Sequence, residues 1–326
     1  MRTRISPVVF AASLVVAGTL AAACGHPARV VAEPVAAPAP VPASAPASPS
    51  AAASESAEPS ASPLSAADVP QTCGVWGCAQ EVRLAAAAAY VSRQPGDLGI
   101  VLHDRNTGAV WRAGDTQHAG WTASTIKVAI AANLLERNRS GRIRLDADDR
   151  SDMDDMLNWS SNDATTALWD KFDGPDMLAG FRTTYGMRGL SVVPGYDVFW
   201  RHLRCTAEDL HNLMAYVLDR LYPADRAYLV DALRGVADNQ HWGVWAAGPA
   251  LLPGNKDGWA LKPDNSPDHW VTHTVGFAGP GERYIVAVTY ELPGSSSLAD
   301  GVHAVSDLVA MVFGARTPAP VVVPPA

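Results

Sequence analysis

The sequence predicts one α+β domain in which N- and C-terminal helices cover a mostly antiparallel sheet, with a helical lobe between its strands. Three observations lead to this class. Helical periodicity marks the stretches 80–93 and Leu298–Phe313, at the two ends of the folded part of the chain. Short alternating or apolar runs predict two strands after the first helix and three before the last. The residues between these two groups of strands carry mostly helical patterns.

The predicted strands have local signals. Leu98–His103 and Ala109–Arg112 form a predicted hairpin, because the Asp, Asn and Gly of residues 104–108 favour a turn. The last three strands are predicted at 254–259, Val271–Phe277 and Tyr284–Tyr290.

The predicted helices follow the same reasoning. In the lobe they are a helix that begins near Ser124 and ends before Gly141, and the stretches 164–171, 174–183 and 206–235. An acidic run at 146–155 predicts a solvated face or the start of a helix. The final helix places Val302, Val305, Val309 and Val312 on one face.

The N-terminus predicts export from the cytoplasm. Residues 1–24 combine a basic start with an apolar run of small residues, which is typical of a signal peptide. Cys24 follows directly and resembles the lipidated cysteine of a bacterial lipobox, although Ala21 stands where Leu is usual. We therefore expect an extracytoplasmic protein anchored to the cell membrane by lipid. Cleavage after Ala23 and release as a secreted protein is the alternative.

Composition sets the remaining boundaries. Residues 25–68 are almost entirely small residues and Pro, so we expect a disordered tether. The folded domain is expected at 69–316, and the Pro/Val-rich residues 317–326 are expected to be disordered. The net charge of -8 disfavours nucleic acid as a partner, and we expect a monomer.

Cysteines and histidines give no metal-site pattern. Cys73 and Cys78 are close enough for a small disulfide loop in an oxidising compartment, and a pairing of either with Cys205 remains open. No second Cys pair follows and the nine His are scattered, so no zinc site is expected.

A Ser and a Lys one helical turn apart mark the candidate active site. Ser124 and Lys127 share a helix face, and the apolar run 128–132 after them predicts a buried helix. Free N–H groups at a helix start stabilise a developing oxyanion, and the same positive end lowers the pKa of a nearby amine. Only four of the 25 basic residues are Lys, which favours a titrating role for Lys127 that Arg does not offer.

Two further motifs follow in order, Ser160-Ser-Asn162 and Lys256-Asp-Gly258. Together with the Ser124 motif they resemble the serine-x-x-lysine, serine-x-asparagine and lysine-threonine-glycine motifs of the serine β-lactamase and penicillin-binding protein superfamily. The resemblance runs from about Val82 to Phe313 and is to class A β-lactamases in particular. It implies the family's α+β fold, an acyl-enzyme mechanism, and no metal or organic cofactor.

The resemblance also implies roles for single residues. Ser124 would be the acylated nucleophile, and Lys127 would accept its proton, directly or through water. Ser160 would relay a proton to the leaving group and Lys256 would place a positive charge opposite it. Asn162, Asp257, Gly258 and Trp259 would contact the substrate, with the backbone N–H groups of Ser124 and Trp259 as oxyanion hole.

Two departures from the family pattern bear on the substrate and on turnover. Asp257 stands where the family has a hydroxyl residue that binds the antibiotic's carboxylate, so penicillins are expected to bind poorly unless Asp257 points away or is itself paired. A preference for a neutral or cationic substrate group is the alternative. Residues 190–205 lack the glutamate that activates the deacylating water in class A enzymes. Asp197 is the only carboxylate there and His202 is another candidate base. Acylation with slow deacylation is therefore expected.

Three functional hypotheses remain. The first is a serine hydrolase or acyl-transferase acting on peptidoglycan-related or β-lactam-like small molecules. The second is a catalytically weak relative that binds cell-wall material or a partner protein. The third is a true β-lactamase with a relocated deacylation base. Trp121, Trp159, Trp200 and Trp259 adjoin the motifs and predict either core packing or an aromatic-walled cleft.

Overall fold

The computed structural model describes residues 73–263 and 268–326. Clustering of contacts divides the chain into two units, and the first, Met1–Ala67, lies outside the described residues. The predicted signal peptide, Cys24 and the predicted tether therefore lie outside them as well. Within the described part of the chain, no helix has the length and apolar character needed to cross a membrane.

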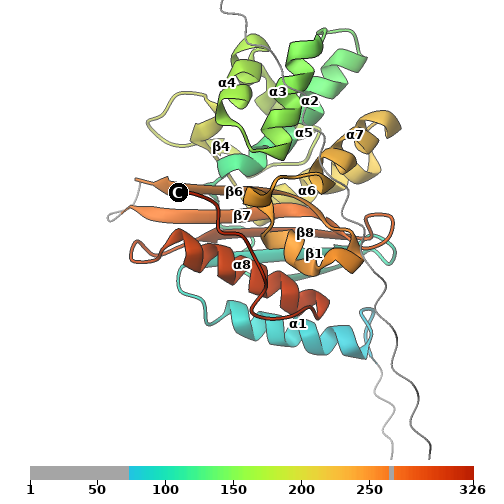
Figure 1. Ribbon diagram of the computed structural model, residues 1–326, viewed down its shortest axis with the longest axis vertical. Helices are drawn as coiled ribbons and strands as arrows, with labels where there is room; N and C mark the ends of the chain where they lie inside the picture. The colour runs from blue at the N-terminus through green and yellow to red at the C-terminus, as the bar shows by residue number, and fades with distance from the viewer. Residues whose placement is uncertain (1–72, 264–267) are drawn as a thin grey trace, which may run out of the picture. The chain divides into compact units, whose positions relative to one another are not determined.

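A five-stranded antiparallel sheet forms the middle layer of the domain, in the order β2-β1-β8-β7-β6 (Figure 1). Its strands are β1 (Asp97–Asp104), β2 (Ala109–Gly114), β6 (Gly254–Lys262), β7 (His269–Ala278) and β8 (Tyr284–Glu291). Asp104 pairs with Ala109, which confirms the predicted hairpin. β8 pairs with β1, so the two groups of strands predicted from the sequence join in one sheet.

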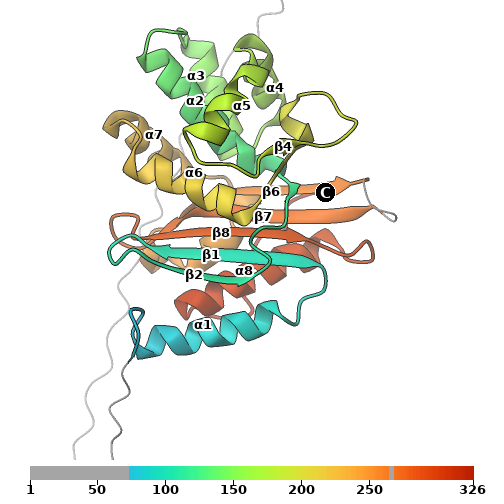
Figure 2. The same cartoon turned by 180° about the vertical axis from the view of Figure 1, so that it is seen from behind.

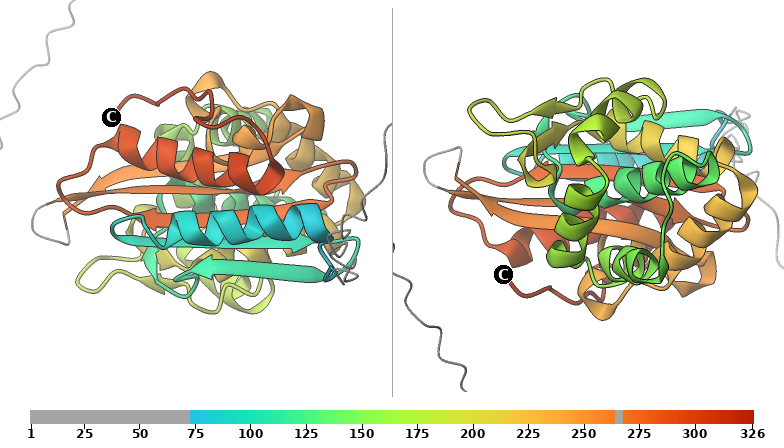
Figure 3. Two further views of the ribbon diagram at one scale, coloured as in Figure 1. Left: turned by 90° about the horizontal axis from the view of Figure 1, so that it is seen from below. Right: turned by 90° about the horizontal axis from the view of Figure 1, so that it is seen from above.

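The two terminal helices cover one face of this sheet (Figures 1 and 3). They are α1 (Cys78–Val91) and α8 (Leu298–Phe313), as the sequence predicts to within two residues for α1 and at both ends for α8. Ser297 caps α8 by accepting a bond from the Asp300 N–H, and Gly314 ends it in the left-handed conformation.

The helical lobe covers the opposite face (Figure 2). It comprises α2 (Lys127–Arg139), α3 (Ala147–Asn158), α4 (Asn162–Lys171), α5 (Gly174–Thr183), α6 (Ala207–Asp219) and α7 (Pro223–Arg234). The predicted helical stretch 206–235 holds two helices, because Pro223 is suited to the first turn of a new helix. The acidic run starts α3, where Asp146 and Asp149 form a capping box.

Several short elements were not predicted. A second, three-stranded sheet has the order β3-β5-β4, and single-turn 3₁₀ helices connect the larger elements. These elements are β3 (Gly120–Trp121), β4 (Ser191–Val192), β5 (Leu203–Cys205), η1 (Ala123–Ile126), η2 (Trp200–His202), η3 (Asp238–Gln240), η4 (Gly243–Ala247) and η5 (Pro249–Leu251).

The sheet separates two hydrophobic cores. In β8, Ile285 and Ala287 pack in the cluster shared with the lobe, whereas Val286 and Val288 pack in the cluster shared with α1 and α8. This is the alternation of a strand buried on both faces. Neighbouring residues of a strand in this sheet therefore face different layers, which matters for the Lys256 motif in the edge strand β6.

Residues 317–326, which the sequence predicts to be disordered, lie along the domain in the structure. The Ala319 N–H donates to Asp307 Oδ1 on α8 at 2.6 Å, and the Val322 N–H donates to the His241 carbonyl at 3.4 Å. Ala319 is buried in the core shared with α1 and α8. Composition alone misses this placement, because the binding groups are backbone amides that any residue except Pro supplies.

Candidate active site

Ser124 lies where the lobe meets the edge strand of the sheet. It sits in η1, which continues directly into α2. Ala123, just before it, has a φ of 44°, in the left-handed region that non-glycine residues rarely adopt. Such backbone strain is concentrated at functional sites. Residues 128–132 are fully buried, in agreement with the predicted buried helix.

Gly258 allows β6 to pass close to this turn. A Cβ at position 258 would lie 2.8 Å from the Ser124 nitrogen and 3.0 Å from the Thr125 nitrogen, so a side chain there would push the strand away. The backbone of β6 thus lies against the N–H end of η1. This is the place where the resemblance puts an oxyanion hole between the N–H groups of Ser124 and Trp259.

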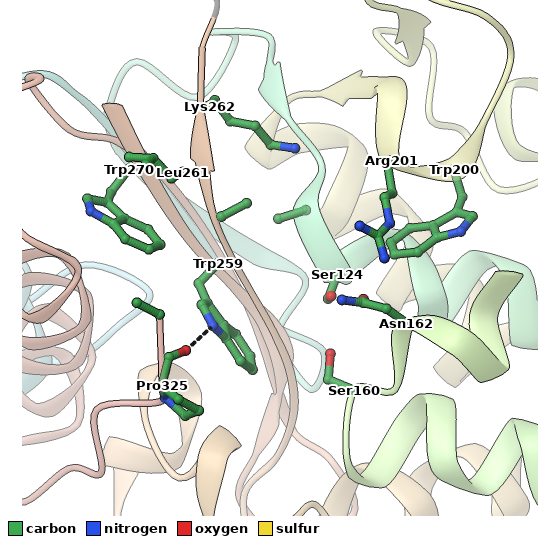
Figure 4. Close-up of a pocket in the computed structure, with 13 residues that line it drawn as sticks. Ser124, Ser160, Asn162, Trp200, Arg201, Trp259, Leu261, Lys262, Trp270 and Pro325 are labelled. Atoms are coloured by element: carbon green, nitrogen blue, oxygen red, sulfur yellow. Dashed lines mark hydrogen bonds between the residues drawn. The ribbon is translucent and has the colours of Figure 1, made fainter. Parts of the chain in front are cut away.

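Ser160 lies in the turn between α3 and α4. Its φ is 59°, again in the left-handed region, and Ser161 caps the following helix by accepting a bond from the Ala164 N–H. Asn162 is the first residue of α4. The turn therefore aims Ser160 and Asn162 into the space beside Ser124 (Figure 4).

Lys127 connects the first motif to the second. Its Nζ donates to the Ser160 carbonyl at 2.7 Å and to Asn162 Oδ1 at 3.0 Å, and it lies 3.2 Å from Ser160 Oγ. Lys127 is completely buried. Within the described residues, its hydrogen bonds run to the Ser160 turn and not to Ser124 Oγ.

Lys256 connects the third motif to the same hydroxyl. Its Nζ lies 2.9 Å from Ser160 Oγ and 3.1 Å from the Asp257 carbonyl, and it also donates to Gln240 Oε1. Ser160 Oγ therefore lies between two lysine amines. If both amines donate to it, the Ser160 proton is free to be given to another group.

Gln240 supports this arrangement and was not found by sequence reasoning. It is fully buried in η3, and its Nε2 donates to the carbonyls of Leu157 and Asn158 at 2.9 and 2.7 Å. Its Oε1 accepts from Lys256 and from the Asp257 N–H. One side chain thus joins the end of α3 to β6.

Burial lowers the pKa of both lysines, and nearby cations lower that of Lys127 further. Burial, Lys256 and Arg201 together hold the pKa of Lys127 well below its usual value. Burial lowers the pKa of Lys256 to about 7, against the opposing effect of Asp257. A lysine with a lowered pKa offers a neutral amine near neutral pH, which is what proton acceptance from Ser124 requires.

Asp257 does not face the cavity, contrary to the substrate contact expected from the sequence. It pairs in register with Thr274, whose hydroxyl accepts a bond from the Val244 N–H in η4, so Asp257 faces the α8 layer. Its carboxylate is completely buried and neither oxygen has a hydrogen bond of normal geometry. Burial raises the pKa of Asp257 well above its usual value, although the nearby Thr274 and Asn255 side chains favour the charged form.

A cavity of about 520 Å³ opens beside Ser124 (Figure 4). Its lining brings together the lobe, β6, β7 and the C-terminal residues. The lining residues are Ala123, Ser124, Ser160, Asn162, Trp200, Arg201, Trp259, Ala260, Leu261, Lys262, Trp270, Pro325 and Ala326. Of the predicted site residues, Ser124, Ser160, Asn162 and Trp259 reach it directly, while Lys127 and Lys256 lie behind Ser160.

Aromatic side chains form part of the cavity wall. Trp200, Trp259 and Trp270 line it, and the Trp259 Nε1–H donates to the Pro325 carbonyl at 3.1 Å. Of the other predicted tryptophans, Trp121 is buried in the core and Trp159 is exposed and does not line the cavity. Two of the four predicted tryptophans, Trp200 and Trp259, therefore line the cavity, together with Trp270, which was not predicted.

The loop before β5 contributes a cation to the cavity. Arg201 lines the cavity, whereas Asp197 and His202 do not. Asp197 Oδ1 is instead bonded to His202 Nδ1 at 2.6 Å, with the Asp197 side chain 79% exposed. The structure therefore does not bring the predicted deacylation base to Ser124.

Sequence reasoning missed Arg201, Lys262 and the C-terminal residues of the lining. Arg201 follows Trp200 in a loop that carries no motif, and only its place beside a flagged tryptophan could have drawn attention to it.

The described cysteines and the described cluster of potential metal ligands do not line the cavity. Cys73 and Cys78 form a disulfide, and Cys205 is a buried free thiol. One group in the described residues has metal-ligand types together: Asp97, His118 and Glu291 place a ligand atom each within 4.8 Å of one another. His118 Nε2 and Glu291 Oε2 already satisfy each other at 2.9 Å, and none of the three lines the cavity.

Known proteins match this chain in sequence and in fold. A model described as "Beta-lactamase enzyme family" matches residues 83–154. A Mycobacterium tuberculosis protein named "Putative lipoprotein LppW" is 28% identical over 211 residues, which cover 62% of this chain. The Mycobacterium bovis protein of the same name matches equally. The match spans 65% of the length of these curated relatives.

Solved structures agree on the fold. A class A β-lactamase from Mycobacterium abscessus has a TM-score of 0.58 at 18% identity, covering 72% of this chain and 100% of that one. A β-lactamase from Burkholderia vietnamiensis has 0.57 at 22% identity, covering 73% and 96%. A protein titled PBP-A has 0.60 at 19% identity, covering 72% and 95%. The chain therefore has the fold of the serine β-lactamase and penicillin-binding protein superfamily, which it also resembles in sequence.

Proposed function

We propose that the protein is an extracytoplasmic serine hydrolase or acyl-transferase that works through an acyl-Ser124 intermediate. The observation that carries the proposal is the double contact of Ser160 Oγ with the buried amines of Lys127 and Lys256, beside the cavity that Ser124 lines. Buried, closely spaced amines with lowered pKa values have little structural use, because burying a cation costs free energy.

The chemical steps follow from these contacts. Ser124 Oγ would attack a carbonyl held in the cavity and lose its proton to the neutral Lys127 amine, directly or through Ser160. The new tetrahedral oxyanion would be stabilised by the backbone N–H groups of Ser124 and Trp259. The Ser160 hydroxyl would then protonate the leaving nitrogen or oxygen and take back from Lys127 the proton that came from Ser124, so that Lys127 is neutral again. The Ser124–acyl bond would form as the bond to that leaving group breaks.

Deacylation is expected to be slow. No described Asp or Glu side chain lines the cavity, and Asp197, which is bonded to His202, is largely exposed to solvent. The third hypothesis, a β-lactamase that uses Asp197 as relocated base, thus has no geometric support. An accumulating acyl-enzyme on a peptidoglycan-related or β-lactam-like donor is the expected behaviour.

The place of action is proposed from sequence and similarity together. The N-terminal signal pattern with Cys24 and the lipoprotein name of the curated relatives both support a lipid-anchored protein outside the cytoplasm. The superfamily fold supports cell-wall or β-lactam-like substrates.

Intact-mass measurement tests the proposal. The protein is exposed to a penicillin and, separately, to a fluorophosphonate, with Ser124→Ala in parallel. The expected result is a stable adduct on the wild type and none on the variant. No adduct with either reagent would overturn the proposal and leave the binding-protein alternative. Turnover of the penicillin without accumulation would contradict the slow deacylation.

A further inference from the structure

The charged side chains among the described lining of the cavity are all basic. Arg201 and Lys262 are the charged residues among the described lining, and no acidic side chain joins them. Asp257, which the sequence suggested as a source of repulsion for anions, is buried on the other face of β6. The electrostatic character expected from the third motif is therefore reversed at the cavity itself.

The backbone of Arg201 is fixed by its surroundings, whereas its guanidinium makes no hydrogen bond or ion pair with a described residue. The preceding Trp200 is 3% exposed, and its Nε1–H donates to Thr166 Oγ1 at 3.2 Å on α4, which fixes the short helix η2. The guanidinium lies 4.9 Å from the centre of the Trp200 ring. Figure 4 shows it extending from the loop toward the part of the cavity that holds Ser124 and Asn162.

No described protein group neutralises this guanidinium. Arginines that pair with acids elsewhere in the domain do so at 2.5–2.7 Å, as in Arg139–Asp225 and Arg283–Asp104. Among the described residues, Arg201 has no such carboxylate and no hydrogen-bond acceptor. A guanidinium carries five N–H donors in a fixed fork that matches a planar anion, and here the fork opens on the cavity. The Lys262 ammonium likewise lies near an aromatic ring, 4.1 Å from the centre of the Trp121 ring.

The opposite wall is apolar. Trp259, Trp270 and Pro325 lie across the cavity from Arg201, with Ser124 and Asn162 between the two sides (Figure 4). A ligand that fills the cavity would place its reacting carbonyl in the middle, an anionic group on one side and an apolar group on the other. Large apolar walls with one well-placed charge are typical of small-molecule sites.

We propose that Arg201 is the specificity-determining residue of the site and binds the anionic group of an acyl donor whose apolar part packs on Trp259 and Trp270. The inference rests on the proposed function for the chemistry at Ser124, but the binding step stands without it. The recognised chemistry is a carboxylate-like anion, held from the segment between β4 and β5 rather than from the third motif.

The test uses two acyl donors that differ in one group. Both are 4-nitrophenyl esters of an arylacetic acid; one ring carries a carboxylate and the other the isosteric carboxamide. In the wild type, the carboxylate ester is expected to acylate Ser124 faster. In Arg201→Gln its acylation rate constant should fall about 10- to 100-fold, as expected when a charged group loses a hydrogen-bonded partner. The carboxamide ester should lose clearly less than the carboxylate ester over the same pair of proteins, and any change that it shows measures the effect of Arg201 on the pKa of Lys127.

Two variants make the result specific. Arg201→Lys keeps the charge but loses the fork, so an intermediate loss is expected. Arg93→Gln removes one exposed charge outside the cavity lining and should leave both esters unchanged. Equal losses for both esters in Arg201→Gln, or none for the carboxylate ester, would overturn the proposal.

Binding separates this inference from the proposed function. Ser124→Ala is titrated calorimetrically with the two unreactive amide analogues of the esters, with and without Arg201→Gln. Preferential binding of the carboxylate analogue that is lost with Arg201 supports the anion site even if no protein is ever acylated. Acylation of the wild type without any preference for the carboxylate would keep the proposed function and refute the anion site.

Discussion

Three buried ionisable residues lie in or next to β6, and they differ in the layer that they face and in their hydrogen bonds. Lys127 and Lys256 face the lobe and share the Ser160 hydroxyl. Asp257 faces the other layer and has only poorly placed neighbours. Lys256 donates hydrogen bonds to Ser160, Gln240 and a backbone carbonyl, and therefore makes none to the adjacent Asp257 carboxylate. Asp257, which departs from the family's third motif, is therefore a buried group that destabilises the fold, and it does not line the cavity.

The replacement Asp257→Asn should stabilise the protein at pH 8. The pKa of Asp257 is raised in the fold from a usual value of 3.8, so above that pH the folded state binds more protons than the unfolded state. The free energy of unfolding then decreases as the pH rises. Asparagine avoids this cost, and a gain of about 1–3 kcal/mol at pH 8 is expected, shrinking toward zero near pH 4.

Urea unfolding at the two pH values measures this difference. The exposed Asp231 on α7 serves as control, because Asp231→Asn makes the same chemical change at the surface and should be nearly neutral. A loss of stability in Asp257→Asn at pH 8 would show that the carboxylate is ionised and paired in the fold.

The sequence could have told more about Asp257 than it did. Ser124, Lys127, Ser160 and Lys256 were predictable because their motifs occur in a fixed order. Asp257 directly follows Lys256 in a strand, and neighbouring strand residues point to opposite faces. Once Lys256 is assigned to the cavity side, its neighbour belongs to the other layer. A residue-type mismatch within a motif was given more weight than the alternation of the strand.

At the level of elements, η3 connects the lobe to the sheet. Gln240 donates to the last carbonyls of α3 and accepts from the β6 residues Lys256 and Asp257. The unsatisfied carbonyls at a helix end need donors, and here one side chain supplies them while orienting the lysine. The distance between Ser160 and Lys256 is therefore set in part by a single-turn helix that carries no motif.

Replacement of Gln240 by Leu should loosen this connection. It leaves buried donors and acceptors without partners, and a loss of about 2–4 kcal/mol in the free energy of unfolding is expected. Acylation of Ser124 should also slow down, because Lys256 loses a fixed acceptor. Chemical denaturation and intact-mass kinetics measure the two effects.

Asn239→Ala is the matched control in the same turn. Its Nδ2 donates to the exposed carbonyl of Trp159 at 3.1 Å, so a loss below about 1 kcal/mol is expected. Equal effects of the two variants would show that η3 acts only as a general support and not through Gln240.

The large elements were predictable and the small ones were not. Strands of six to ten residues and helices of ten or more carry enough periodicity to be recognised. β3, β4 and β5 are two or three residues long, and η3 has three. Their positions depend on contacts with residues far away in the sequence, such as the pairing of Gly120 with Cys205. Arg201 and Gln240 lie next to or within such elements, and for this reason they escaped notice.

At the scale of the described domain, the C-terminal residues join α8 to the edge strand β6. They leave the end of α8 and run back along it (Figure 3), where the Ala319 N–H donates to Asp307, and they reach the cavity, where the Pro325 carbonyl accepts from Trp259. The cavity that receives the acyl donor is thus partly filled by the chain itself. A donor with a bulky apolar group would have to displace Pro325 and Ala326 from the wall.

Removal of residues 317–326 should therefore favour bulky donors. The bond from Trp259 Nε1 to the Pro325 carbonyl is of a kind worth about 0.5–1.5 kcal/mol, so a donor that no longer breaks it should acylate Ser124 about 2- to 10-fold faster. A small donor that leaves the wall in place should be unaffected. The measurement is the acylation rate constant for a pair of esters that differ only in the size of the acyl group.

Asp307→Ala tests the same idea without truncation, because it removes the hydrogen bond to the Ala319 N–H outside the cavity lining and should give a smaller gain in the same direction. Faster acylation by small and bulky donors alike would point to a general change of the site. Slower acylation by both would show that these residues build the wall and do not obstruct it.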